Sequence, residues 1–157
     1  MRDKPDENGQ LDRFDEKILA ALAKDGRMPI TELARLVGLS KSPCQVRVRR
    51  LQEQEYILGF RAVLNPVMLG RDHVAFAEVR LTDTTEKALS AFNQAVRKVP
   101  EIEQCHMIAG SFDYLLKIRT ADILAYRKIL GETITTLPHV SNTSTSVSME
   151  AVKDLAF

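Results

Sequence analysis

The apolar residues of this 157-residue chain change their spacing about halfway along it, and this change restricts the folds open to it. Up to Leu51 they recur every three or four residues, which is typical of amphipathic helices. From His73 onward, apolar and β-branched runs alternate with helical stretches. The two patterns predict an N-terminal helical domain and a C-terminal α+β domain.

The N-terminal half contains three predicted helices with recognisable start and stop signals. The first follows Asp12, an N-cap residue type, and has one apolar stripe at positions 11, 14, 18, 19 and 22. The second begins near Pro29 and ends at Gly38, a residue favoured at helix C-termini. The third begins after Ser40, the expected N-cap. Two short helices joined by a glycine-containing turn, the second rich in Arg, are typical of a helix-turn-helix.

The third helix has two distinct edges. Cys44, Val48 and Leu51 lie on one side at spacings of four and three, so we expect them to pack on the first two helices. Residues 41–50 include four cations and no acid, which a solvated helix face would explain equally well. On the outward side, however, short polar groups suit base edges and cations suit phosphates. The predicted DNA-binding residues of this helix are Ser40, Lys41, Ser42, Gln45, Val46, Arg47, Arg49 and Arg50.

The run YILGFRAVL at 56–64 is apolar and β-branched around a central glycine. It predicts a two-stranded wing that ends at the Asn65-Pro66 pair. Arg61 in this wing is a further candidate for a phosphate contact. A merely solvated arginine is the equal alternative.

The C-terminal half predicts the order strand, helix, strand, strand, helix, strand. The strands are expected over 73–81, 102–109, 114–120 and 144–152, and the helices over 85–99 and 122–136. Asp83 and Glu86 are expected to form a capping pair at the first of these helices. This order is that of a ferredoxin-like domain, in which both helices cover one face of the sheet.

The other face of the predicted sheet is not clearly polar. In the strand from Ile102, three apolar residues, Cys105, Met107 and Ala109, share one side, and Ile102 and Ile108 share the other. The Tyr-Leu-Leu run that opens the next strand likewise has no polar side. A sheet that is apolar on both faces needs a second cover, and we expect another subunit to provide it. A two-fold dimer also suits a two-fold operator.

Composition argues against several classes of protein. The net charge of +1 is far from that of a histone-like protein, and no stretch approaches the roughly 18 apolar residues of a membrane span. Residues 1–10 are polar, so we expect a flexible arm rather than a secretion signal, and a cytoplasmic protein. The two cysteines form no CxxC motif and the three histidines are scattered, so no metal or cofactor is expected.

Four segments together give the chain a close resemblance to the Lrp/AsnC family, the leucine-responsive or feast/famine regulators. They are LDRFDEKIL at 11–19, ELARLVGLS at 32–40, SPCQVRVRRL at 42–51 and GSFDYLLKIRT at 110–120. The resemblance extends from Leu11 to about Val152. It implies a DNA-binding transcription regulator with a winged helix-turn-helix domain, whose dimers form through the C-terminal sheet and associate further, commonly into octamers.

The resemblance also implies an effector site. Members of the family bind a small effector, usually an amino acid, where ferredoxin-like domains meet, and residues 110–114 match the effector-linked loop. A glycine there allows close backbone approach, and an Asp can accept hydrogen bonds from an α-ammonium group; the alternative is that both serve only the turn. The predicted effector-binding residues are Met107, Gly110, Ser111, Asp113 and Tyr114. Within the family, residues 40–51 are most similar to proline-utilisation regulators of proteobacteria, which implies proline as the effector.

One residue departs from the family pattern. Family members commonly have Gly before the wing, where this chain has Glu55, and a positive φ would cost Glu on the order of 1 kcal/mol. We therefore expect the helix to run past this residue or the wing to enter at a different angle. The expected domains are a flexible arm over 1–10, a winged helix-turn-helix over 11–64, a linker over 65–72, and a ferredoxin-like effector-binding and oligomerisation domain over 73–157.

Two other functions fit the same chain. The AsnC-like fold also occurs in sirohaem decarboxylases, so the resemblance admits an enzyme of tetrapyrrole chemistry. Cys105 and His106 would be strand neighbours that point to opposite faces, however, and could not share a metal. The third hypothesis is an architectural protein that wraps DNA without responding to any effector.

Overall fold

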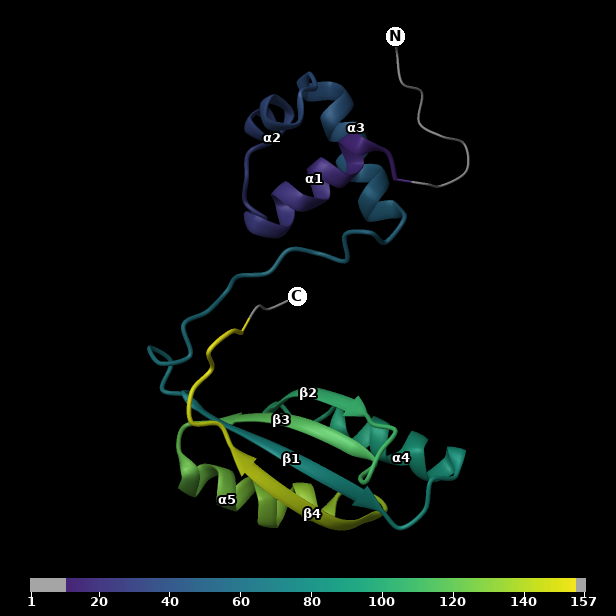
Figure 1. Ribbon diagram of the computed structural model, residues 1–157, viewed down its shortest axis with the longest axis vertical. Helices are drawn as coiled ribbons and strands as arrows, with labels where there is room; N and C mark the ends of the chain where they lie inside the picture. The colour runs from purple at the N-terminus through teal and green to yellow at the C-terminus, as the bar shows by residue number, and fades with distance from the viewer. Residues whose placement is uncertain (1–10, 155–157) are drawn as a thin grey trace. The chain divides into compact units, whose positions relative to one another are not determined.

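The computed structural model describes residues 11–154 (Figure 1). The chain divides into two compact units, residues 1–63 and 64–157, and each has its own core. The order of elements confirms an α+β chain with three helices followed by a βαββαβ unit. The arm expected over residues 1–10 lies outside the described residues. Within residues 11–154, no helix combines the length and hydropathy needed to cross a membrane.

Helix α1, Arg13–Lys24, begins where the sequence predicts because Asp12 caps it. The Asp12 carboxylate accepts hydrogen bonds from the backbone N–H groups of Phe14 and Asp15. In return, the Asp15 side chain accepts one from the backbone N–H of Asp12. These reciprocal bonds satisfy donors that have no partner inside the helix, so the start of α1 is fixed by two acids.

Helices α2, Ile30–Val37, and α3, Lys41–Glu53, are joined by a turn in which Gly38 has a φ of 83°. Glycine adopts this left-handed conformation without a Cβ clash. Ser40 holds the predicted N-cap position of α3, although its side chain makes no capping hydrogen bond. The core of this unit confirms the predicted buried edge of α3, since Val48 packs against a cluster of Ile18, Ala21, Leu33, Ala34, Val37, Cys44 and Leu51.

The end of α3 resolves the question posed by Glu55. The helix stops at Glu53, and Glu55 has a φ of 60°, so the expectation that the helix runs past residue 55 is wrong. Family members commonly have glycine at this position. Here Glu55 adopts the left-handed conformation instead, at a cost of about 1 kcal/mol. Two backbone hydrogen bonds hold the turn, from Glu55 N to Gln52 O and from Ile57 N to Leu51 O, both at 3.1 Å.

The two-stranded wing expected over residues 56–64 is not formed. No strand lies between Glu53 and His73, and Leu58 and Val63 are largely exposed. An isolated two-stranded ribbon is only marginally stable unless it packs on an apolar surface, and of residues 56–64 only Ile57 is even partly buried. Ile57 packs against the helical core, and the half-exposed ring of Phe60 lies against Gly26 in the turn after α1.

The C-terminal unit is built on a four-stranded antiparallel sheet with the order β2-β3-β1-β4. Its strands are β1 His73–Leu81, β2 Ile102–Met107, β3 Tyr114–Thr120 and β4 Val140–Val147. Helices α4, Glu86–Val96, and α5, Ile123–Glu132, pack on one face of the sheet, and a short 3-10 turn, Ile134–Thr136, follows α5 (Figure 1). This is the predicted ferredoxin-like arrangement.

Several boundaries in this unit differ from the prediction. Strand β4 lies over 140–147 rather than 144–152, β2 ends before residue 108, and both helices are shorter than expected. The expected capping pair of Asp83 and Glu86 is also wrong. Thr85 is the N-cap of α4 and accepts from the backbone N–H of Ala88, while Asp83 accepts from the Thr85 hydroxyl.

An irregularity in β2 changes which of its residues share a face. The alternation of the sequence places Ile102 and Cys105 on opposite faces, yet both pack on the core beneath the helices. The reason is that the pairing with β3 shifts between Ile102 and Gln104, and such a shift reverses the alternation beyond it. Beside Cys105, the same core contains Tyr114 and Phe92, whose ring centroids are 4.4 Å apart.

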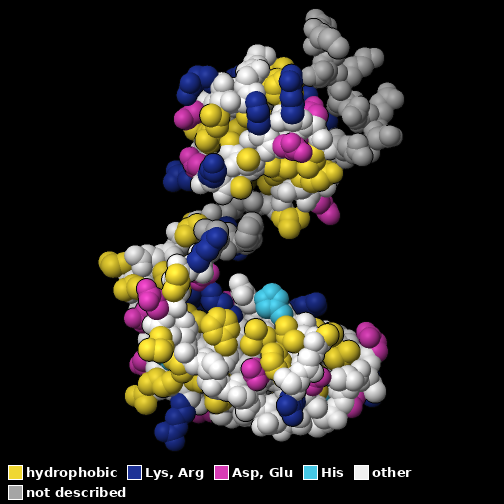
Figure 2. All heavy atoms as spheres, viewed as in Figure 1, with side chains coloured by type: hydrophobic (Ala, Val, Ile, Leu, Met, Phe, Trp, Pro, Cys, Tyr) yellow, Lys and Arg dark blue, Asp and Glu magenta, His cyan; other side chains and the backbone are white. Residues whose placement is uncertain are grey.

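The opposite face of the sheet carries no helix of the described chain. Its central residues include Phe76 and Leu115, which are half-buried, and charged residues such as Glu78, Lys117 and Arg119 lie around them. Figure 2 shows the hydrophobic side chains that gather on the C-terminal unit, bordered by charged ones. This open face is therefore apolar only at its centre. The sequence predicted a face that is apolar across its width.

Candidate DNA-binding and effector sites

The outward face of α3 is a polar surface with an exposed cation at its middle. Its exposed residues are Ser40, Lys41, Ser42, Gln45, Val46 and Arg49. The side chain of Arg49 is 80% exposed, and Val46 beside it is 68% exposed. Because the buried edge of the helix lies on the other side, these groups are able to enter a groove without disturbing the core.

Two of the predicted DNA-binding arginines are paired with acids at the start of α1. Nη1 of Arg47 lies 2.6 Å from Oδ2 of Asp12 and 2.9 Å from Oδ1 of Asp15. Nη2 of Arg50 lies 2.5 Å from Oδ2 of the same Asp15. The side chains of Arg47 and Asp15 are only 12% and 1% exposed. In the described chain these guanidinium groups therefore neutralise a buried carboxylate.

The same network joins the start of α1 to the middle of α3. Asp12 caps α1 and binds Arg47 at the same time, and the guanidinium of Arg47 lies 5.4 Å from the ring centre of Phe14. Burial alone raises the pKa of the Asp12 carboxyl, but hydrogen bonds from the Asp15 backbone and from Arg47 outweigh it, so the pKa is lowered from its ordinary value of 3.8. Both acids thus help to fix the orientation of the outward face of α3.

Arg49 lies outside this network. Its Nε donates to Oε1 of Glu53, one turn further along, at 2.8 Å, and both side chains are exposed. An exposed pair of this spacing is worth about 0.3–0.5 kcal/mol, so Arg49 can exchange Glu53 for a DNA group at little cost. Arg61, the candidate outside α3, is exposed in the segment after it, without the wing that was expected to carry it.

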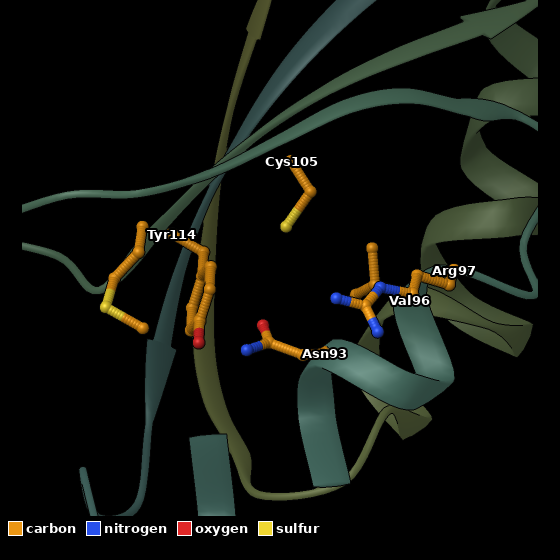
Figure 3. Close-up of a pocket in the computed structure, with 6 residues that line it drawn as sticks. Asn93, Val96, Arg97, Cys105 and Tyr114 are labelled. Carbon is orange, nitrogen blue, oxygen red and sulfur yellow. The ribbon is translucent and has the colours of Figure 1, made fainter. Parts of the chain in front are cut away.

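The second candidate site is a pocket on the helix-covered side of the sheet. Its volume is about 350 Å³, and it is lined by Asn93, Val96, Arg97, Cys105, Met107 and Tyr114. Figure 3 shows side chains from the last turn of α4 and from the strands pointing into one space. Two of the six, Met107 and Tyr114, belong to the predicted effector-binding set.

The other members of that set lie outside the pocket lining. Gly110 and Ser111 are exposed in the turn between β2 and β3. Asp113 is tied to β1, because its Oδ2 accepts from the backbone N–H of Leu81 at 2.7 Å and its own N–H donates to Val79 O at 2.9 Å. Asp113 therefore joins the turn between β2 and β3 to β1, and its contact with an effector stays a prediction.

Sequence reasoning did not find the contribution of α4 to this pocket. Asn93 lies in the last turn of α4, and Arg97, four residues later, is the C-cap residue of the same helix. In the sequence they look like ordinary polar residues of an amphipathic helix. The one available signal was an Asn and an Arg at helical spacing just before the loop that leads into β2.

The polar groups of the pocket surround a buried phenol. Tyr114 is 1% exposed, and the Asn93 amide points toward its hydroxyl (Figure 3). Burial raises the pKa of this hydroxyl, as do nearby Cys105, Asp113 and Glu86, and Asn93 opposes the shift. Burial also raises the pKa of the Cys105 thiol, which favours its neutral form.

A helix-turn-helix unit followed by a separate α+β unit is an architecture of DNA-binding transcription regulators. Residues 11–52 match the family model of the AsnC-type helix-turn-helix domain, and residues 74–156 match that of the Lrp/AsnC ligand binding domain. The chain belongs to the Lrp/AsnC family, as its motifs indicated.

Several relatives of known name share nearly the whole chain. A proline dehydrogenase transcriptional activator from Rhizobium radiobacter is 65% identical over 144 residues, which are 92% of each protein. The leucine-responsive regulatory protein of Escherichia coli K12 is 50% identical over 143 residues, 91% of this chain and 87% of that protein. A transcriptional regulator from Neisseria meningitidis, solved as a complex with L-Met, superposes with a TM-score of 0.88 at 30% identity, covering 93% and 94% of the two chains.

Proposed function

We propose that this regulator binds operator DNA through the outward face of α3 and that a small amino acid controls its DNA binding or assembly. One observation supports the DNA-binding part: the three arginines of α3 have different partners. Arg49 is exposed and pairs only with exposed Glu53, whereas Arg47 and Arg50 pair with buried Asp15 and hold the helix in place. Short polar residues near the start of a recognition helix commonly contact base edges, and cations contact phosphates.

A binding assay with matched variants tests this part. The affinity of the purified protein for a fluorescent DNA fragment from upstream of its own gene is measured for the parent, Arg49→Ala and Lys128→Ala. Lys128 is an exposed cation on α5, so its removal changes the net charge equally. Arg49→Ala is expected to cost roughly 1–3 kcal/mol of binding free energy and Lys128→Ala nearly nothing. Equal affinity of both variants and the parent would overturn the assignment of α3.

L-Proline is the proposed effector. Support comes from the 65% identity to a proline dehydrogenase transcriptional activator, and from a pocket whose size suits a small ligand. A ligand that binds only the native state raises the melting temperature by mass action, so a thermal-shift screen against the twenty amino acids tests the proposal. A rise with proline is expected; a rise with leucine or lysine alone would replace proline, and no rise with any amino acid would contradict effector control.

The open face of the sheet is proposed to bind a second copy of this chain, and the dimers to assemble further, into an octamer. Phe76 and Leu115 form an apolar centre on a face that no helix of the described chain covers. Leu115→Glu is expected to yield monomers in light scattering. Leu124→Glu, at an exposed apolar position on α5, is the control and is expected to keep the dimer. A dimeric Leu115→Glu protein would contradict this interface.

A further inference from the structure

Val46 is an apolar residue in the middle of the otherwise polar outward face of α3. An α-helix turns by about 100° per residue, so Val46 lies nearly opposite the buried edge formed by Cys44, Val48 and Leu51. It packs on neither hydrophobic core, and it is 68% exposed. The side chain of Val46 therefore projects away from the core, toward whatever this face of α3 contacts.

Three polar side chains surround Val46 on this face. Ser42 lies about one turn before it, Arg49 about one turn after it, and Gln45 beside it, and all three are exposed. A single exposed valine elsewhere on a protein surface needs no explanation. Here, however, the apolar group lies within the surface that is proposed to enter the groove of the operator. Its methyl groups gain free energy on binding only if the DNA offers them an apolar partner.

The major groove offers one such partner. All base pairs present hydrogen-bond donors and acceptors there, but only thymine adds a methyl group, at C5. Burying a methyl group removes apolar surface from water and is worth about threefold to fourfold in affinity. Ser42 and Gln45 carry donors and acceptors for the polar groups of base edges, whereas the methyl groups of Val46 distinguish the bases that carry a methyl from those that do not.

We propose that Val46 is a specificity-determining residue that reads the C5 methyl group of thymine in the major groove. This inference rests on the proposed binding of operator DNA by α3, and it adds which chemical feature of the operator is recognised there. Valine and serine have similar helix propensities, and Val46 packs on neither core. Val46→Ser therefore removes both methyl groups of the side chain and leaves the fold intact.

Deoxyuridine provides the test, because it pairs as thymidine does and lacks only the C5 methyl group. The fragment from upstream of the regulator's own gene is amplified with either thymidine or deoxyuridine triphosphate. The affinity of the full chain for each product is measured by fluorescence anisotropy. The parent is expected to bind the thymine fragment about threefold or more tighter than the deoxyuridine fragment. Val46→Ser is expected to bind both fragments with nearly equal affinity.

Two control variants separate recognition of the methyl group from general effects on binding. Val67→Ser makes the same change at a valine that is 65% exposed in the other unit, and it is expected to keep the parental preference for thymine. Gln45→Ala shortens the side chain next to Val46 on the same face. It is expected to weaken binding to both fragments and to keep the preference, because the methyl contact remains.

The outcomes also distinguish this inference from the proposed function. If the parent binds both fragments equally well, or if Val46→Ser keeps the parental preference, recognition of thymine by Val46 is overturned. It is also overturned if either control variant loses the preference as Val46→Ser does. In each of these cases, the effect of Arg49→Ala on the thymine fragment decides DNA binding by α3 separately. A parent that binds neither fragment contradicts the proposed function and this inference together.

Discussion

Nη1 of Arg47 in α3 lies 2.9 Å from Oδ1 of Asp15 in α1, and this carboxylate is 1% exposed. The other oxygen of Asp15 binds Arg50, so two cations of α3 meet one buried anion. Removing one member of such a group leaves the others charged and buried, which is far more costly than the pairing is beneficial. The network therefore has consequences for stability and for DNA binding that differ residue by residue.

Asp15→Ala is expected to lower the free energy of unfolding by about 3 kcal/mol, because the guanidinium groups of Arg47 and Arg50 lose their buried partner. Urea denaturation followed by the helical circular dichroism signal measures the change. Glu16→Ala is the matched control, since it removes an exposed acid from the next position of the same helix and is expected to change stability by at most about 0.5 kcal/mol. Similar midpoints for the two variants would contradict the role of Asp15.

Asp12 predicts a particular dependence of stability on pH. Its carboxyl has a lowered pKa in the folded protein, so its ionised form stabilises the fold above the unfolded value near 3.8. That contribution is lost as the pH falls below about 4 and through the folded pKa. Asp12→Asn is therefore expected to flatten the acid side of a melting-temperature profile recorded from pH 6 to pH 3. A parent and a variant with parallel profiles would show that Asp12 is not linked to folding.

Glu55 offers a stabilising substitution. With φ at 60°, Glu55→Gly is expected to gain about 0.5–1 kcal/mol from relief of the left-handed strain, less the added freedom of the unfolded chain. Gln52→Gly, in the last turn of α3, is expected to lose about 1 kcal/mol, because glycine disfavours helix. Chemical denaturation of both variants checks the contrast in sign, and a loss of stability in both would contradict it.

Glu53 is expected to weaken DNA binding through its bond to Arg49. Glu53→Gln frees Arg49 and removes an acid close to the DNA-facing surface, so affinity for the operator is expected to rise roughly twofold to fivefold at low salt. Glu132→Gln removes the same charge from the end of α5 and serves as the control. If both substitutions raise affinity equally, net charge rather than the Arg49 contact explains the effect.

The sequence alone was sufficient to predict features that depend on residues close together in the chain. The limits of β1 and β3, the caps at Asp12 and Gly38, and the buried edge of α3 all follow from periodicity and residue type, and the structure confirms them. Each depends on neighbours within a few positions along the chain.

Features that depend on distant partners could not be inferred in the same way. Arg47 looks like a phosphate contact because its partners precede it by more than thirty residues. The face reached by Ile102 depends on a register shift that no periodicity reveals. The pocket escaped notice because Arg97 and Tyr114 come from a helix and a strand that meet only in the folded unit.

The salt dependence of DNA binding tests most directly the claim that the outward face of α3 binds DNA while its inner arginines hold it in place. Operator affinity is measured by fluorescence anisotropy from low to high salt for the parent, Arg49→Gln and Arg47→Gln, at temperatures where all three are folded. Loss of a phosphate contact lowers the slope of log affinity against log salt by about 1. Arg49→Gln is expected to show this loss, and Arg47→Gln is expected to keep the parental slope with lower thermal stability. A reduced slope for Arg47→Gln together with a parental slope for Arg49→Gln would contradict the division of roles on α3.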